Sequence, residues 1–181
     1  MNGGRVVVAI TLWAVFNYTT EAANIGAAID LAKKIINDPS DPHVDGAKAS
    51  LRDDPGVQGG KVLRIVVAKK GTNPWDAAVG GPVNKPIKTG DKLILAFWAR
   101  LEKGENGATT TLPYNAVQLA SAPYSTVISG SSDIGPEWKM YQIAGKADHD
   151  YPAGQLKVTF QLATAKQTVD FGPIMLFDMG Q

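Results

Sequence analysis

After residue 47, apolar and polar residues alternate in short segments that are separated by turn sequences such as DDPG, KGENG and YPAG. The alternation predicts strands over 48–52, 61–68, 91–101, 114–120, 124–129, 138–144, 154–162 and 171–178. Regular spacing with no helix between the segments is typical of an antiparallel sandwich or jelly roll. We therefore expect an all-β fold, an antiparallel β-sandwich.

The same alternation predicts which side chains share one face of a strand. The sets that we expect in the core are Leu93, Leu95, Phe97 and Ala99; Leu156, Val158, Phe160 and Leu162; Val117 and Leu119; and Leu63, Ile65 and Val67. The opposite faces are mixed and carry Arg64, Trp98, Arg100, Gln118, Thr159 and Gln161. These residues are either an ordinary solvent-facing surface or a surface that presents amides, guanidiniums and an indole to a ligand.

The first 46 residues have a different pattern, which predicts an N-terminal strand/helix extension and a sandwich over 47–181. Residues 6–16, VVVAITLWAVF, are continuously apolar and too short to span a bilayer as a helix. They resemble the apolar part of a secretory signal, and equally a buried strand, which we favour. Residues 20–36 have helical spacing, with one apolar face formed by Ile25, Ile29, Ala32 and Ile36.

Composition narrows the function classes. The chain has 181 residues, 44% of them hydrophobic, and a net charge of +1. Its Lys and Arg residues are scattered, so the basic cluster of a nucleic-acid-binding protein is not present in the sequence. There is no Cys, which excludes disulfides and thiol catalysis, and the two His residues do not have the spacing of a metal site.

No catalytic motif is found. Most acidic residues fall in predicted turns, whereas a glycosidase places two carboxylates on either side of one bond. Aromatic residues instead stand near loops, at Trp75, Tyr114, Tyr124 and Tyr151. Aromatic rings cover the apolar face of a sugar, and amide and guanidinium groups hydrogen-bond to its hydroxyls. The pattern therefore favours carbohydrate binding without catalysis.

One long stretch resembles a known family. GGKVLRIVVAKKGTNPWDAAVGGPVNKPIKTGDKLILAFWARLE is similar to the first half of carbohydrate-binding modules of families four, nine and twenty-two. VQLASAPYSTVISGSSDIGPEWKMYQI and LKVTFQLATAKQTVDFGPIMLFDMG continue the resemblance to about residue 180. It implies a jelly roll that binds a β-glycan, xylan or β-glucan, in a cleft on one sheet. It also implies a module of a secreted glycoside hydrolase, and so an extracellular location.

The resemblance assigns roles to a few residues. Trp75, which follows Asn73 in NPWDA, matches a loop Trp that stacks on sugar, and Tyr124 matches a Tyr of the cleft. The alternative for Trp75 is a cap on the edge of the sandwich. Strand phase adds Gln118 and Gln161 to the expected site. Further ligand-binding candidates are Arg64, Trp98, Arg100 and Asn73.

Many members of these families hold a structural Ca²⁺ through oxygen ligands. Asp178, in MLFDMG, is the one candidate ligand that the sequence offers. Two other functions stay open. One is a polysaccharide-active hydrolase or lyase on the same sandwich, with Tyr124 and Lys157 as its only hints. The other is an assembly subunit whose segment 6–16 adds a strand to a neighbour.

Overall fold

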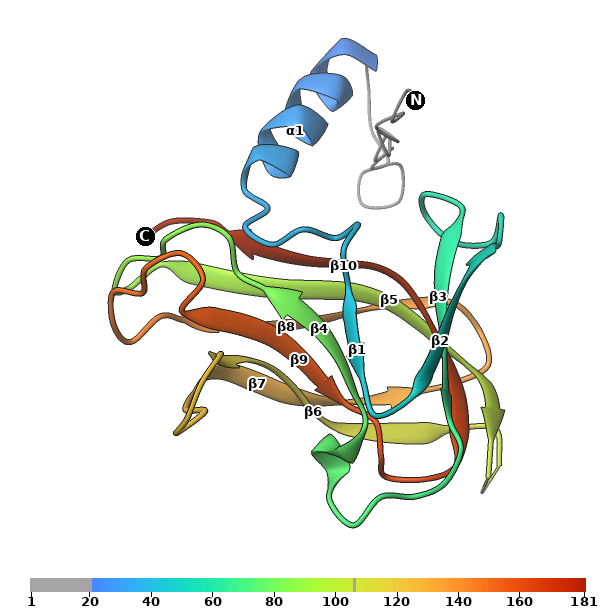
Figure 1. Cartoon of the computed structure of the whole chain (residues 1–181). Coiled ribbons are helices and arrows are strands. Elements are labelled where there is room, and N and C mark those ends of the chain that lie inside the picture. The colour runs from blue at the N-terminus through green and yellow to red at the C-terminus, as the bar shows by residue number, and fades with distance from the viewer. Residues whose placement is uncertain (1–20, 106) are drawn as a thin grey trace, which may run out of the picture.

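The computed structural model describes residues 21–105 and 107–181 as two facing five-stranded antiparallel sheets with one helix attached (Figure 1). We name each sheet after its central strand. The β9 sheet has the order β1-β4-β9-β6-β7, with β1 His43–Asp45, β4 Ala78–Pro82, β6 Thr110–Leu119, β7 Thr126–Ile134 and β9 Leu156–Gln161. The β10 sheet has the order β2-β3-β10-β5-β8, with β2 Lys48–Asp53, β3 Lys61–Val67, β5 Lys92–Gly104, β8 Lys139–Lys146 and β10 Gln167–Asp178. The all-β sandwich predicted from the sequence is confirmed.

The core lies between the two sheets and contains the faces that alternation predicts. Phe97 of β5, Phe160 of β9 and Phe171 of β10 are fully buried and meet at its centre. The Phe97 and Phe160 rings are 4.6 Å apart in an edge-to-face arrangement, which aromatic pairs prefer. Because strand side chains alternate, fixing these faces inward also fixes which residues point outward from each sheet.

Two strands were missed by the sequence analysis. β1 is only three residues long, and β4 has the sequence AVGGP, in which Gly and Pro hide the strand signal. Both belong to the β9 sheet and pair with each other between His43–Asp45 and Ala78–Gly80. The boundary drawn at residues 46/47 therefore does not coincide with the edge of the sandwich, because β1 lies before it.

The helix α1 spans Glu21–Lys33, shorter than the predicted 20–36, and rises from one edge of the sandwich (Figure 1). The apolar face expected from helical spacing is divided, because Ile36 is buried in the core beyond the end of α1 whereas Ile29 is 52% exposed. Leu31 and Ile35 contact Met175 and Phe177 on the outer face of the β10 sheet. The predicted strand over residues 6–16 lies outside the described residues.

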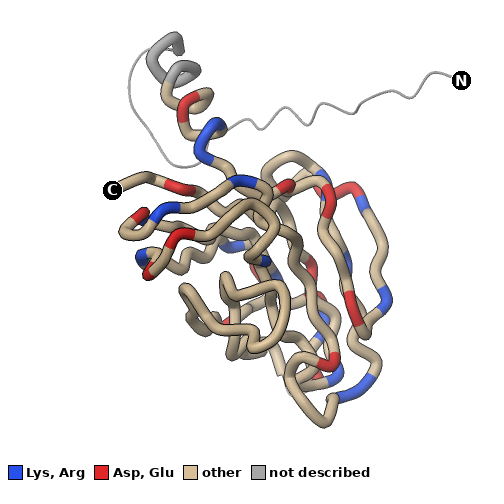
Figure 2. Tube along the Cα trace, turned by 60° about the vertical axis from the view of Figure 1, so that its left-hand side comes forward, with Lys and Arg blue, Asp and Glu red and all other residues tan. Residues whose placement is uncertain are grey.

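The described helix is too short and too polar to cross a bilayer. Figure 2 shows basic and acidic residues interspersed along the described chain rather than gathered on one side.

One exposed ion pair predicts how stability changes in acid. Asp150 accepts hydrogen bonds from the backbone N–H and hydroxyl of Thr89, at 2.8 and 2.9 Å, and pairs with Lys88. These contacts lower the pKa of Asp150 from 3.8 to about 2. A carboxylate whose pKa is lowered in the folded state stabilises the fold at pH values above its ordinary pKa. This stabilisation is lost as the pH falls and the carboxylate of the folded protein is protonated.

We therefore expect Asp150→Ala to flatten the loss of stability between pH 3.8 and about 2 relative to the wild type. Urea unfolding midpoints measured across this range check the expectation. Parallel acid profiles for the two proteins would contradict it.

Candidate functional site

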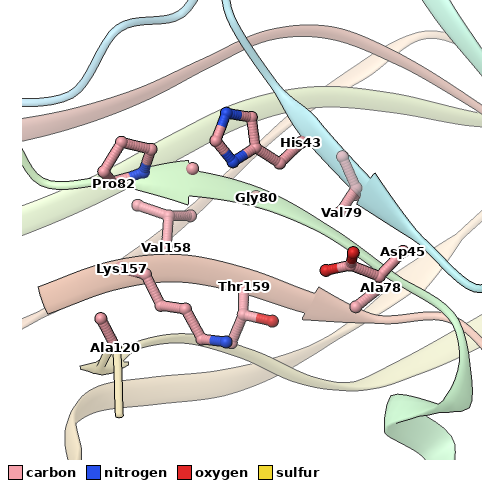
Figure 3. Close-up of a pocket in the computed structure, with 11 residues that line it drawn as sticks. His43, Asp45, Ala78, Val79, Gly80, Pro82, Ala120, Lys157, Val158 and Thr159 are labelled. Atoms are coloured by element: carbon pink, nitrogen blue, oxygen red, sulfur yellow. The ribbon is translucent and has the colours of Figure 1, made fainter.

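The outer face of the β9 sheet carries a groove of about 250 Å³ over β1, β4 and β9 (Figure 3). Its floor is made of small residues, among them Ala78, Gly80 and Gly81. A Cβ atom at Gly80 would come within 1.8 Å of the Val158 carbonyl oxygen, so the approach of β4 to β9 requires glycine there. The close pairing of β4 with β9 and the small size of the β4 residues together create the space of the groove.

Three ionisable side chains border the groove, two from β1 and one from β9. His43, Asp45 and Lys157 project over the small residues between them (Figure 3). Lys157 is half-buried, and no carboxylate of the described residues lies within 4.0 Å of its Nζ. That Nζ lies 5.4 Å from the centre of the Tyr124 ring, within cation–π range.

Two polar side chains on the same sheet face have no hydrogen-bond partner within the described protein. Gln118 and Thr159 are only 8% and 7% exposed as whole residues. Strand register places Gln118 beside Lys157 and Thr159 beside Ala116, so both point outward. Neither belongs to the side chains whose unpaired polar atoms are shielded from solvent, so their polar atoms lie open at the surface of the sheet. Their hydrogen-bonding capacity is therefore free for a ligand.

Gln161 lies on the same outward face, where it is half-buried and in register with Ala78. Tyr114 lies on the same face, and its hydroxyl is 2.5 Å from the hydroxyl of Thr126 on the neighbouring strand β7. The β9 sheet face thus collects amides, hydroxyls and aromatic rings over a floor of small residues.

Trp75 stands at one end of this face. It lies in the short helix η1 (Pro74–Asp76), directly before β4, and is 60% exposed. Ala163, just after β9, donates its backbone N–H to the Pro74 carbonyl at 3.0 Å, which ties η1 to the end of the sheet. The alternative role for Trp75, as a buried cap on the edge of the sandwich, does not fit this exposure.

Tyr124 stands at the opposite end of the face, in the turn after β6, and is 53% exposed. Its φ of 59° lies in the left-handed region, which is uncommon for a residue other than glycine. Such conformations gather at functional sites. Trp75 precedes β4, whereas Tyr124 lies beside Lys157, which pairs with the last residue of β4, so the two aromatic residues lie toward opposite ends of this strand.

The other predicted ligand residues lie on the opposite side of the molecule, on the outer face of the β10 sheet. Arg64 donates two hydrogen bonds to Asp170, at 2.7 and 2.8 Å, and Arg100 donates to the same carboxylate at 3.1 Å. Arg64 also pairs with Glu102 and Arg100 with Asp54. The hydrogen bonds that Arg64 donates to Asp170 raise the pKa of Arg64 above its usual value. Both guanidiniums are thus held by protein carboxylates.

Trp98 and Asn73 also have partners within the protein. The Trp98 indole N–H, on the β10 sheet face, donates to Gln58 at 3.2 Å. Asn73 closes the first turn of η1, where its backbone N–H donates to the Asp76 carboxylate at 2.9 Å. That contact lowers the pKa of Asp76. Asn73 therefore fixes the loop that carries Trp75, and the structure gives it no place in the groove.

Asp178 is the single calcium ligand predicted from the sequence. Its carboxylate accepts the backbone N–H of Gly180 at 2.8 Å. Across residues 21–105 and 107–181 no group of three or more acidic or histidine side chains converges in a way that could hold a metal ion. Calcium binding at Asp178 stays a prediction.

Some residues of the face were not predicted to bind the ligand. Strand alternation placed Thr159 in the outward set, and Lys157 was named only as a hint of the enzyme, although both lie in phase with Gln161 on β9. His43 and Asp45 could not be found in this way, because β1 is short and is surrounded by Pro and Asp residues.

Comparison with known proteins adds information on the fold. No protein-family model and no curated protein sequence matches the chain. Among solved structures, a family 4 carbohydrate-binding module has a TM-score of 0.61 at 19% identity, covering 77% of this chain and 96% of the other. The N-terminal cellulose-binding domain of Cellulomonas fimi β-1,4-glucanase C has a TM-score of 0.57 at 19% identity, covering 81% and 93%.

A third similar structure joins a CBM22 module to a GH10 module in Clostridium thermocellum xylanase 10B, in complex with xylohexaose. It has a TM-score of 0.56 at 9% identity, covering 80% of this chain and 28% of the other. The solved structures that the chain resembles are thus of the type expected from the sequence. The fold of this chain is the β-sandwich of the family 4 and family 22 carbohydrate-binding modules.

Proposed function

We propose that this protein binds a β-linked plant polysaccharide, xylan or β-glucan, along the outer face of the β9 sheet and breaks no bond in it. The observation that carries the proposal is the pair Gln118 and Thr159, which lie on an outward sheet face, largely enclosed by their neighbours, with no internal hydrogen bond. Their amide and hydroxyl groups are therefore held in place at the surface of the sheet, where they can hydrogen-bond to the hydroxyls of a ligand.

The flanking side chains support a sugar as that ligand. Trp75 and Tyr124 offer exposed rings at the two ends of the face, and rings stack on the C–H faces of pyranoses. Gln161 and Lys157 add donors along the groove between them. We further propose that the chain acts as a secreted accessory module of a glycoside hydrolase, as in the xylanase to which its fold is similar.

The second candidate function is a polysaccharide-active enzyme, and the number of carboxylates that line the groove is the evidence on it. Asp45 is the one carboxylate among the described residues that line the groove, whereas acid–base cleavage of a glycosidic bond uses two. We therefore place binding first and test for cleavage in the same experiment.

The test is affinity electrophoresis through gels that contain xylan, mixed-linkage β-glucan, mannan or no polysaccharide, with and without a chelator. We expect retardation in the xylan or β-glucan gel that persists in chelator, and no new reducing ends in the polysaccharide. Unchanged mobility in every gel would refute the proposal, and release of reducing ends would replace it with the enzyme.

Gln118→Met gives a sharper test of the carrying observation. We expect the affinity to fall by about three- to tenfold, since one neutral hydrogen bond contributes about 0.5–1.5 kcal/mol. Stability should not fall, because the Gln118 amide has no partner within the described protein and Met fills similar space. Isothermal titration with oligosaccharide and urea unfolding measure the two quantities. An unchanged affinity, or a loss of stability with no loss of binding, would contradict the role of this amide.

A further inference from the structure

A second cavity lies away from the groove, at the edge of the sandwich beside β2. It measures about 650 Å³ and opens between β2, β3, β10 and the segment 38–42. Its apolar lining comprises Pro39, Pro42, Leu51, Val62, Leu63, Phe171, Pro173 and Ile174. Leu51 is 75% exposed, more than any other large hydrophobic residue described. Apolar surface left open to water in this way marks an interaction site.

The strand beside the cavity also has a free edge. β2 is the first strand of the β10 sheet and pairs with β3 along all of its six residues, in uninterrupted register. Its other edge has no partner strand among residues 21–105 and 107–181. No proline and no bulge interrupts it, and its charged residues Lys48, Arg52 and Asp53 stand toward its two ends, which leaves the stretch 49–51 without any of the usual devices that protect an edge strand. Such an edge can accept one more strand.

The chain itself contains a segment of the right chemistry. Residues 6–16 are continuously apolar, and the sequence favours a strand there. In a strand, one side would carry Val6, Val8, Ile10, Leu12, Ala14 and Phe16. A strand paired with the free edge of β2 would place one such row on the cavity side, next to Leu51.

The position of α1 indicates which copy of the chain supplies the segment. α1 is anchored at its C-terminal end by Leu31 and Ile35, and its N-terminal end points away from the sandwich (Figure 1). A helix of 13 residues is about 20 Å long. Residues 17–20, which precede it, span at most roughly 14 Å. Because α1 leads away from the sandwich, we favour the β2 edge of a second copy, rather than that of the same chain, as the acceptor.

We propose that residues 6–16 of one copy add as a strand to the free edge of β2 in a second copy and fill the cavity lined by Leu51. Reciprocal exchange would give a closed symmetric dimer. The proposal is independent of the glycan-binding face, which lies on the other sheet.

The test measures mass by size-exclusion chromatography with light scattering over a wide range of concentrations. We expect the full chain to form dimers, and both Leu51→Arg and a variant lacking residues 2–17 to remain monomeric. Because Leu51 is exposed, its substitution should leave the thermal unfolding midpoint of the monomer unchanged. Ile29→Arg is the matched control, since Ile29 is exposed on α1 away from the cavity, and this variant should still dimerise.

A peptide of residues 5–17 provides the second measurement. It should bind the variant lacking residues 2–17, and Leu51→Arg in that variant should abolish the binding. A full chain that stays monomeric would overturn the proposal, and so would a dimer that survives Leu51→Arg. A monomer that is destabilised by the deletion would show docking within one chain and would overturn exchange between copies.

Discussion

Trp75→Ala should lower the affinity for the bound oligosaccharide by about 30-fold and leave the stability of the protein unchanged. An aromatic side chain that dominates a binding site contributes about 2 kcal/mol or more, which corresponds to this factor. The fold should not suffer, because Trp75 is 60% exposed and the backbone of η1 is held by contacts that do not involve the indole. Isothermal titration and urea unfolding of the same preparation measure both effects.

Val66→Ala is the control for this experiment. Val66 is an exposed hydrophobic residue on the outer face of β3, on the side of the molecule away from the groove. Its truncation should leave the affinity unchanged. If Trp75→Ala binds as tightly as the wild type, Trp75 is not part of the binding site.

Asp170→Ala should have the largest effect on stability, a loss of about 3 kcal/mol in the free energy of unfolding. Asp170 is 1% exposed and accepts hydrogen bonds from both Arg64 and Arg100. Removing one partner of a buried ion pair costs about 3–5 kcal/mol, because the remaining charge loses its compensation. We expect the lower end of this range, since Glu102 and Asp54 remain to pair with the guanidiniums.

The comparison variant is Asp53→Ala, which breaks the exposed ion pair between Asp53 and Lys61. Exposed pairs contribute about 0–1 kcal/mol, so this variant should unfold close to the wild-type midpoint. Equal losses for the two variants would refute the structural role of the Asp170 cluster. Glycan affinity should be unchanged in a folded Arg100→Met variant, and a clear loss there would return Arg100 to the binding site.

The face of each residue was predictable from the sequence, but its sheet was not. Alternation correctly predicts that Gln118 and Arg100 both point outward. It carries no information on the strand order that puts Gln118 on the β9 sheet and Arg100 on the β10 sheet, because that order depends on pairing between distant segments. The mixed outward set found in the sequence is therefore two surfaces with different chemistry.

Partners supplied by distant loops explain the remaining differences. Trp98 and Arg100 resemble ligand-binding residues in the sequence, since nothing near them in the chain can satisfy them. In the fold, the loop after β2 brings Gln58 and Asp54 over them. Trp75 and Tyr124 lie in loops as well, but the described structure leaves their rings exposed.

The tether of η1 has a consequence for the kinetics of binding. Pro74, the Asn73–Asp76 contacts and the bond from Ala163 hold the loop backbone before any ligand arrives. Docking a sugar on Trp75 then restricts little more than two side-chain torsions, so no slow loop closure should limit association. The association rate constant should be high and similar in the wild type and the variants. The 30-fold effect of Trp75→Ala should therefore appear almost wholly as faster dissociation, that is, as a shorter lifetime of the complex.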